Sequence, residues 1–203
     1  NGTLKKDSSK RLTRYIRLLL VPLSYLIPNQ IIYCSESCKD LHEKLGYSKD
    51  RSFLIENGVE IRGPSYLEGP LYIGLNTFIK PLTQIKKSVI GPSCKIGGEI
   101  DSVIIQGYTN KVHEGHLGDS FLGEWINLGA GTINSNLKNN YESVKVQIND
   151  QSVDTGEIHL GCFIGDHVKT AIGTLINTGT VIGPGSMIAT DGFPPKTIKP
   201  FTW

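Results

Sequence analysis

The sequence places an apolar residue at every sixth position over long stretches, a period that neither a helix nor a strand produces. The first series holds, six residues apart, Ile61, Leu67, Ile73, Ile79 and Ile85, and a second runs in the same step from Ile158 to Ile188. Helices repeat every 3.6 residues and strands every 2. A period of six is typical of a parallel β-helix, in which each hexad forms one flat strand and one corner. The period therefore predicts a mainly β fold whose stacked coils bury the repeated residues.

Glycine follows many of the periodic residues, as in Ile73-Gly74 and Ile164-Gly165, and makes up 23 of the 203 residues. A corner pressed between the coils above and below it favours a residue without Cβ. The period lapses after Leu137, where residues 144–148 alternate and Asn149-Asp150 suits a turn. We therefore expect hexapeptide coils over residues 58–203 and a hairpin insertion near residues 141–155.

Residues 1–57 precede the six-residue period, and their pattern predicts a partial α/β segment. Its expected elements are a helix over 8–27, a strand over 30–34, a helix over 35–45 and a strand over 52–55. The stretch LIPNQIIYCSESCKDLHEKLGYSKDRSFLIENGVE resembles the inter-domain region of two-Rossmann-domain glycosyltransferases, although Glu56 stands where a proline is usual. Two interpretations stay open: a fragment of such an enzyme, or an α/β cap on the open end of the β-helix. Because the chain begins at Asn1 and not at Met, we expect it to be part of a longer protein.

Net charge, hydropathy and cysteine spacing argue against a nucleic-acid partner, a membrane span and a zinc site. The net charge is only +2, which gives no basis for expecting a nucleic-acid partner. The apolar stretch over 15–27 contains Arg17 and Pro22 and is too short for a membrane span. The four cysteines lack the spacing of a zinc site and are too few for a secreted disulfide framework, so we expect a cytoplasmic protein.

A more specific motif lies between Ile104 and Asn136, where the chain reads IIQGYTNKVHEGHLGDSFLGEWINLGAGTINSN. The His-x3-LGD stretch, the LGAGT corner and the Asn four residues after its Thr resemble the C-terminal acetyltransferase domain of the bifunctional N-acetylglucosamine-1-phosphate uridylyltransferase and glucosamine-1-phosphate acetyltransferase family. The likeness runs from about Gly58 to Trp203. It implies a left-handed β-helix, acetyl-CoA as co-substrate, an amino-sugar phosphate as acceptor in UDP-N-acetylglucosamine synthesis, and a homotrimer with sites between adjacent chains.

The resemblance also implies roles for single residues. His113, fifteen residues before Leu128 of the LGAGT corner, matches the catalytic base. Asn127 and Asn136 match positions that contact the sugar and the acyl group, and Gly129 and Ala130 form the backbone near the thioester. Two further substrate contacts are expected: His116, where the family carries an aromatic ring, and Lys111, which could supply positive charge for a sugar phosphate.

The expected chemistry suits these residue types. A sugar amine attacks a thioester only after it loses a proton, and an imidazole, with an ordinary pKa of about 6.5, is a suitable base. A backbone N–H near Ala130 can stabilise the oxyanion, and asparagine amides can orient the sugar. No metal is required for this transfer.

Plainer interpretations stay open for the same residues. His113 could be a solvated loop histidine, His116 a packed ring, Lys111 a solvated lysine, and the two asparagines corner residues in the left-handed conformation. Some hexapeptide trimers are zinc carbonic anhydrases, but the His-x4-His spacing of that family does not occur here, so we predict no metal site.

The competing function is not enzymatic. The coils could form a non-catalytic trimeric scaffold, or the chain could be a fragment of a glycosyltransferase or sugar nucleotidyltransferase. Uridylyl transfer needs a nucleotide-binding domain with a glycine-rich phosphate loop, and no such loop is seen in the sequence.

Overall fold

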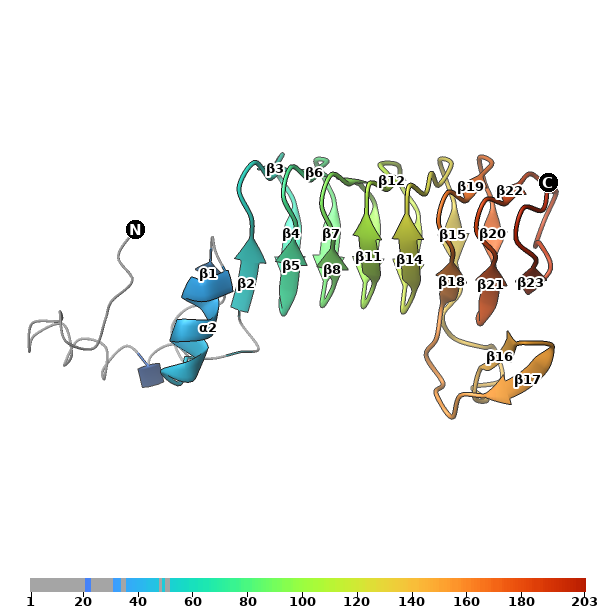
Figure 1. Ribbon diagram of the computed structural model, residues 1–203, viewed down its shortest axis with the longest axis horizontal. Helices are drawn as coiled ribbons and strands as arrows, with labels where there is room; N and C mark the ends of the chain where they lie inside the picture. The colour runs from blue at the N-terminus through green and yellow to red at the C-terminus, as the bar shows by residue number, and fades with distance from the viewer. Residues whose placement is uncertain (1–20, 23–30, 34–35, 48, 50–51) are drawn as a thin grey trace, which may run out of the picture.

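The computed structural model describes residues 21–22, 31–33, 36–47, 49 and 52–203. These residues form a mainly β solenoid whose parallel strands stack along one axis, and α2 (Glu36–Lys44) lies at its N-terminal end (Figure 1). The fold is the left-handed parallel β-helix that the period of six predicts. Within the described part of the chain no helix is long and apolar enough to cross a membrane.

The coils have three faces, which we call A, B and C. Face A is a sheet of nine strands, β1 (Ile31–Tyr33), β2 (Ser52–Ile55), β5 (Leu71–Ile73), β8 (Val89–Ile90), β11 (Ile104–Gly107), β14 (Phe121–Glu124), β18 (Cys162–Ile164), β21 (Thr180–Ile182) and β23 (Thr197–Ile198). Face B carries β3 (Glu60–Ile61), β6 (Phe78–Ile79), β9 (Lys95–Ile96), β12 (Asn110–Lys111), β19 (Lys169–Thr170) and β22 (Met187–Ile188). Face C carries β4 (Tyr66–Glu68), β7 (Gln84–Lys86), β10 (Glu99–Asp101), β13 (His116–Gly118), β15 (Ile133–Asn134) and β20 (Leu175–Ile176).

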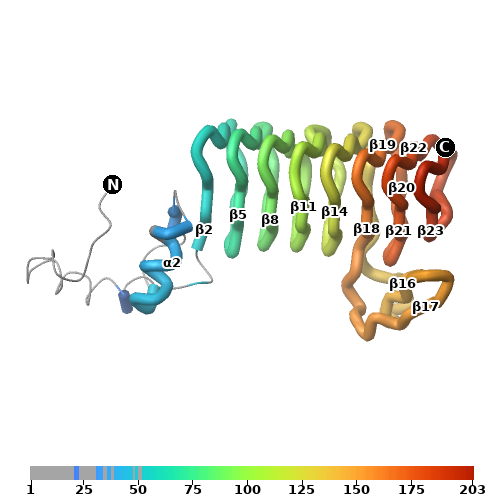
Figure 2. Tube along the Cα trace, in the orientation of Figure 1, coloured from blue at the N-terminus to red at the C-terminus, as the bar shows by residue number. Residues whose placement is uncertain are grey.

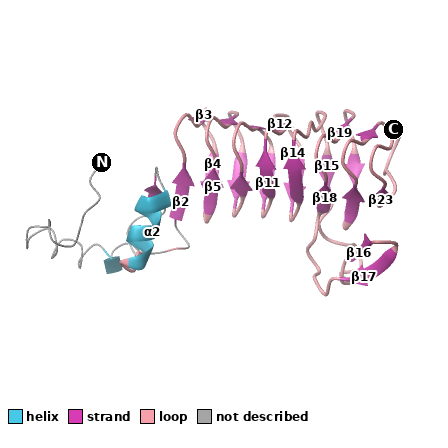
Figure 3. Cartoon of the chain, in the orientation of Figure 1, coloured by secondary structure: helices cyan, strands magenta, loops and turns pink. Residues whose placement is uncertain are grey.

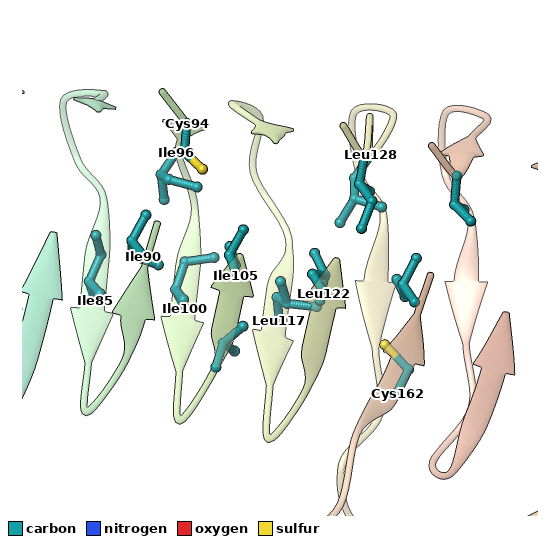
Figure 4. Packing of buried hydrophobic residues seen from close by; sticks show 14 of the residues in the cluster. Ile85, Ile90, Cys94, Ile96, Ile100, Ile105, Leu117, Leu122, Leu128 and Cys162 are labelled. Carbon is teal, nitrogen blue, oxygen red and sulfur yellow. The ribbon is translucent and has the colours of Figure 1, made fainter. Parts of the chain in front are cut away.

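Each face sends one column of side chains into the core, and the strand registers align these residues from coil to coil. The column of face A is aliphatic throughout: Ile55, Ile73, Ile90, Ile105, Leu122, Ile164, Ile182 and Ile198. Figure 4 shows such side chains from neighbouring coils meeting inside the prism. Most are fully buried, so apolar burial stabilises every coil against its neighbours.

Three interior positions break this aliphatic rule, and all three lie in the middle of the prism. Lys111 follows Ile96 in the column of face B, and Thr170 precedes Ile188 in the same column. Asn134 precedes Ile176 in the column of face C. None of the three is more than 6% exposed. Polar groups at such positions need hydrogen-bond partners inside the core.

One corner between faces B and C is shorter than its neighbours. The interior residues Ile96 and Ile100 are four residues apart, whereas Ile79 and Ile85 in the preceding coil are six apart. Gly98, with φ +80°, closes this short corner. The hexad series of the sequence loses its phase after Ile85 because the next interior residue, Ile90, follows after only five residues, and the short corner at Gly98 shifts the phase further.

The N-terminal elements continue face A. Strands β1 and β2 are parallel with α2 between them in the sequence, and β2 pairs with β5 of the prism. Phe53, 1% exposed, belongs to the same buried cluster as the coils. Figures 2 and 3 show α2 at the N-terminal end of the prism. Of the helix predicted over residues 8–27, all but residues 21–22 lies outside the described residues.

A hairpin leaves the prism between β15 and β18. Its strands β16 (Lys145–Ile148) and β17 (Gln151–Asp154) are antiparallel and project from the body of the prism (Figure 1). Asn149 and Asp150 both have positive φ, as the tight turn of a two-residue hairpin requires. The hairpin follows Asn136 in the sequence, so it starts beside the motif.

Candidate active site

The motif residues lie on faces B and C and at the edge between them, in two adjacent coils. His113 and Ala130 each stand two residues after an interior residue of face B, Lys111 and Leu128, and these two occur in adjacent coils. The two corner residues are therefore equivalent and lie one coil apart, about 4.8 Å along the axis. His113 is exposed. The carbonyl of Ala130 accepts a bond of 2.7 Å from Gly173 N–H, and within the described residues no bond from the Ala130 N–H itself is seen.

His116 and Asn136 meet on the outer surface of face C, over Gly118. A Cβ added to Gly118 would lie 2.5 Å from His116 Nε2 and 3.0 Å from Asn136 Nδ2. The absence of a side chain at Gly118 therefore leaves room for both nitrogens. Asn136 is fixed by a bond of 2.6 Å from its Nδ2 to Asp119 Oδ2. This arrangement presents two polar groups side by side, as a sugar site requires.

A carboxylate orients His116 from the coil below. Glu99 and His116 are register partners in β10 and β13, and Glu99 Oε2 lies 3.6 Å from His116 Nδ1. The other ring nitrogen of His116, Nε2, lies over Gly118. Both side chains are partly exposed, so we assign this ion pair little stability.

Asn127 lies on the neighbouring face. Its Oδ1 accepts a bond of 2.7 Å from Asn110 Nδ2, and its backbone bridges Asn110 and Lys169 in the outer column of face B. Gly129 stands at the corner between this residue and Ala130, and its N–H donates to Thr170 Oγ1 over 3.0 Å. A Cβ at Gly129 would lie 2.5 Å from the backbone of Ala171, so the corner has room only for glycine.

Lys111 is not where we expected it. Its side chain was predicted to contact a sugar phosphate, but it is 1% exposed and points into the prism. The ammonium donates to the carbonyls of Gly97, at 3.2 Å, and of His113, at 2.6 Å. Alternation along a short strand places every second side chain inside, and Lys111 falls on the interior position of β12. The structure thus does not bring Lys111 to the outer surface with the other motif residues.

Burial changes the titration of this lysine. Loss of solvent lowers the pKa of Lys111 from 10.5 to about 8, partly opposed by Glu114. Below pH 8 the folded and unfolded chains are both protonated, and the buried charge is then fully unfavourable. Between pH 8 and 10.5 the unfolded chain holds more protons, so stability should rise with pH, by about 3 kcal/mol in total.

We therefore expect the free energy of unfolding of the wild type, relative to Lys111→Met, to increase across this pH window. Burial raises the pKa of the Cys94 and Cys162 thiols to about 11, so these thiols make the free energy of unfolding fall as the pH rises. This contribution is the same in the wild type and in Lys111→Met, so it cancels in the comparison. Denaturant titrations at pH 7 to 10.5 measure the difference, with Lys95→Met, exposed on the same face, as the control. Parallel pH profiles for the wild type and Lys111→Met would contradict the buried-ammonium assignment.

Several contributing residues were not found from the sequence. Glu99 precedes the interior residue Ile100 and pairs with His116, but a count in steps of six misses this position because the corner at Gly98 is two residues shorter. Asp119 belongs to the LGD motif, but its bond to Asn136 crosses between coils and leaves no local signal. Among the described residues, no group of three or more His, Cys, Asp and Glu side chains is placed to hold a metal ion.

Comparison with known proteins supports the family resemblance. The chain is 36% identical over 152 residues to a bifunctional sugar-1-phosphate nucleotidylyltransferase/acetyltransferase of Sulfurisphaera tokodaii, covering 68% of this chain and 37% of that protein. It is 34% identical over 129 residues to the bifunctional protein GlmU of Methanococcus vannielii, covering 63% of this chain and 30% of that protein. The chain thus spans about a third of the length of these curated relatives. No protein-family model matches it.

Among solved structures, the chain matches a mutant of GDP-perosamine N-acetyl transferase from Caulobacter crescentus in complex with CoA and GDP-perosamine. The identity is 13%, the match covers 87% of this chain and 68% of that one, and the TM-score is 0.23, too low for us to build on. The sequence resemblance itself is confirmed: the chain is similar to bifunctional sugar-1-phosphate nucleotidylyltransferase/acetyltransferase (GlmU) proteins, and its β-solenoid is consistent with the C-terminal left-handed β-helix acetyltransferase domain of that family.

Proposed function

We propose that this chain transfers the acetyl group of acetyl-CoA to the amine of an amino-sugar phosphate such as glucosamine-1-phosphate, a step of UDP-N-acetylglucosamine synthesis. One observation carries the proposal: the residues expected from the motif, apart from the buried Lys111, lie on faces B and C of two adjacent coils, with His113 one coil from Ala130 and His116 beside Asn136. Four relatives also support it: one is a bifunctional sugar-1-phosphate nucleotidylyltransferase/acetyltransferase, and three are bifunctional proteins GlmU.

In the proposed mechanism His113 removes a proton from the sugar ammonium, and the freed amine nitrogen attacks the thioester carbonyl. The Ala130 N–H donates to the oxyanion that forms at this carbonyl. When the intermediate collapses, the C–S bond breaks and the thiolate of coenzyme A leaves. The nitrogen gives up its second proton to the leaving sulfur, and the proton held by His113 passes to solvent, so the products are the amide, the free thiol and H⁺. His116, Asn127 and Asn136 orient the acceptor through hydrogen bonds without adding a fixed charge.

We also propose a homotrimer, and the outer surface of face A supports it. The outward side chains of this face form an apolar column of Tyr72, Val89, Ile104, Phe121, Phe163 and Val181. Val89, Ile104 and Phe121 are 37–47% exposed in the single chain. A continuous apolar surface of this kind is unfavourable in water unless a partner covers it.

Thiol release tests the proposed activity directly. The purified chain should release free thiol from acetyl-CoA when glucosamine-1-phosphate is added, and more slowly or not at all with glucosamine, which lacks the phosphate. A reaction without acceptor corrects for the four cysteines of the chain itself. If a folded trimer releases no thiol with any amino sugar or amino-sugar phosphate, the non-catalytic scaffold becomes the better description.

A further inference from the structure

The three polar residues of the interior columns each bond to backbone directly behind the candidate site. Lys111 Nζ donates to the carbonyl of His113. Thr170 Oγ1 accepts from the N–H of Gly129, the residue before Ala130. Asn134 Oδ1 accepts from Gly118 N–H at 2.7 Å, and its Nδ2 donates to the carbonyl of Gly118 at 2.9 Å. Elsewhere in the described coils these columns are aliphatic.

The corner that carries His113 also differs from the ordinary corners of the same edge. In three of those corners a hydroxyl four residues after the interior residue donates to a carbonyl of its own corner: Ser65 to Arg62, Thr83 to Lys80, and Thr174 to Ala171. At the corresponding place after Lys111 stands Gly115, which has no hydroxyl. The Lys111 ammonium supplies a corner donor instead, and it bonds to His113.

Gly115 makes this unusual corner sterically feasible. Its φ is +120°, whereas Leu82, Gly131 and Gly173 carry the positive φ one residue earlier in their corners. A Cβ at Gly115 would lie 2.3 Å from the carbonyl oxygen of Thr132 in the next coil. Both the conformation and the contact require glycine. The corner that lacks the hydroxyl is therefore the same corner that contains the lysine donor, and it carries the exposed residue His113.

Resting on the acetyltransferase function proposed above, we propose that Lys111 is a positioning residue, whose buried ammonium holds the backbone of His113 so that the imidazole faces the reacting amine. Asn134 and Thr170 hold Gly118 and Gly129 in the same way. A cation inside an apolar core is unfavourable, and its hydrogen bonds to two carbonyls of successive corners offset part of this. An aliphatic residue at this position would pack as Ile79 and Ile96 do, but it would leave the His113 corner without its donor.

The test compares three variants. Lys111→Met keeps the length of the side chain but removes the donor, and Lys111→Gln restores one shorter donor. Thr83→Val removes the hydroxyl bond of an ordinary corner two coils away, and it serves as the matched control. We expect Lys111→Met to lower kcat by about 10- to 100-fold, because small misplacements of a catalytic group have effects of this size. The KM for acetyl-CoA should stay within about twofold, Lys111→Gln should recover part of kcat, and Thr83→Val should keep it.

A second measurement does not depend on activity. Hydrogen exchange should accelerate at the amides of Gly97 and Glu99, which bond to the carbonyls of Lys111 and Gly115, in Lys111→Met but not in Thr83→Val. If the wild type transfers no acetyl group, the proposed function fails and this exchange still decides whether Lys111 holds the corner. A folded Lys111→Met with kcat within twofold of the wild type, or with unchanged exchange, would overturn the proposal. If Lys111→Met does not fold, the same two readouts on Lys111→Gln decide it.

Discussion

His113→Ala should lower kcat for acetyl transfer by about 10²–10⁴-fold, the usual contribution of a general base. The KM for acetyl-CoA should change little, because the imidazole acts on the acceptor amine. In the wild type, kcat/KM should rise with pH as the base loses its proton, and this limb should be missing in the variant. Initial rates of thiol release across a pH series with saturating acetyl-CoA measure both effects.

His116→Ala is the matched control for this experiment, since it removes an imidazole three residues away on the outer surface of face C. We expect it to raise the KM for the acceptor and to leave the pH limb in place. The reverse result, with the limb lost in His116→Ala and kept in His113→Ala, would transfer the role of base to the histidine that Glu99 orients. Full activity in both variants would refute acetyl transfer by these residues.

Replacing two outward residues of face A with charges, Ile104→Glu with Phe121→Glu, should convert the trimer into monomers. The two residues are paired in β11 and β14, so both charges would be buried together in the proposed interface. The motif residues of faces B and C stay on the same prism in the monomer, so activity should fall less than in His113→Ala. Light scattering and sedimentation report the assembly, and thiol release the activity.

Leu82→Glu is the control for this change, because it also places a charge on an exposed apolar residue, 76% exposed, but at an edge away from face A. It should remain trimeric and active. A wild type that is monomeric and fully active at working concentration would contradict the assembly proposal. A charged double variant that remains trimeric would show that face A does not form the interface.

The architecture of the prism could be predicted because each hexad repeats the same local requirement. An aliphatic residue must enter the core once per face, and Ile73, Ile90 and Ile105 stack in register once that requirement is met. The hairpin strands β16 and β17 could be read in the same way, since a strand alternates and Asn149-Asp150 suits its turn. Likewise His113, Asn136 and the LGAGT corner lie within one short stretch of sequence, so two neighbouring coils carry all of them.

Other parts of the site depend on contacts between coils, and no local pattern encodes these. Glu99 pairs with His116 across two coils, and the short corner at Gly98 takes Glu99 out of the six-residue count, so the pairing is visible only when the coils are stacked. The sequence by itself determined the β-helix and the motif residues, since side-chain periodicity and spacing are properties of the chain. Only the tertiary structure decided that Lys111 faces inward, because the carbonyls of Gly97 and His113 that offset the burial of its charge come together only when two coils stack.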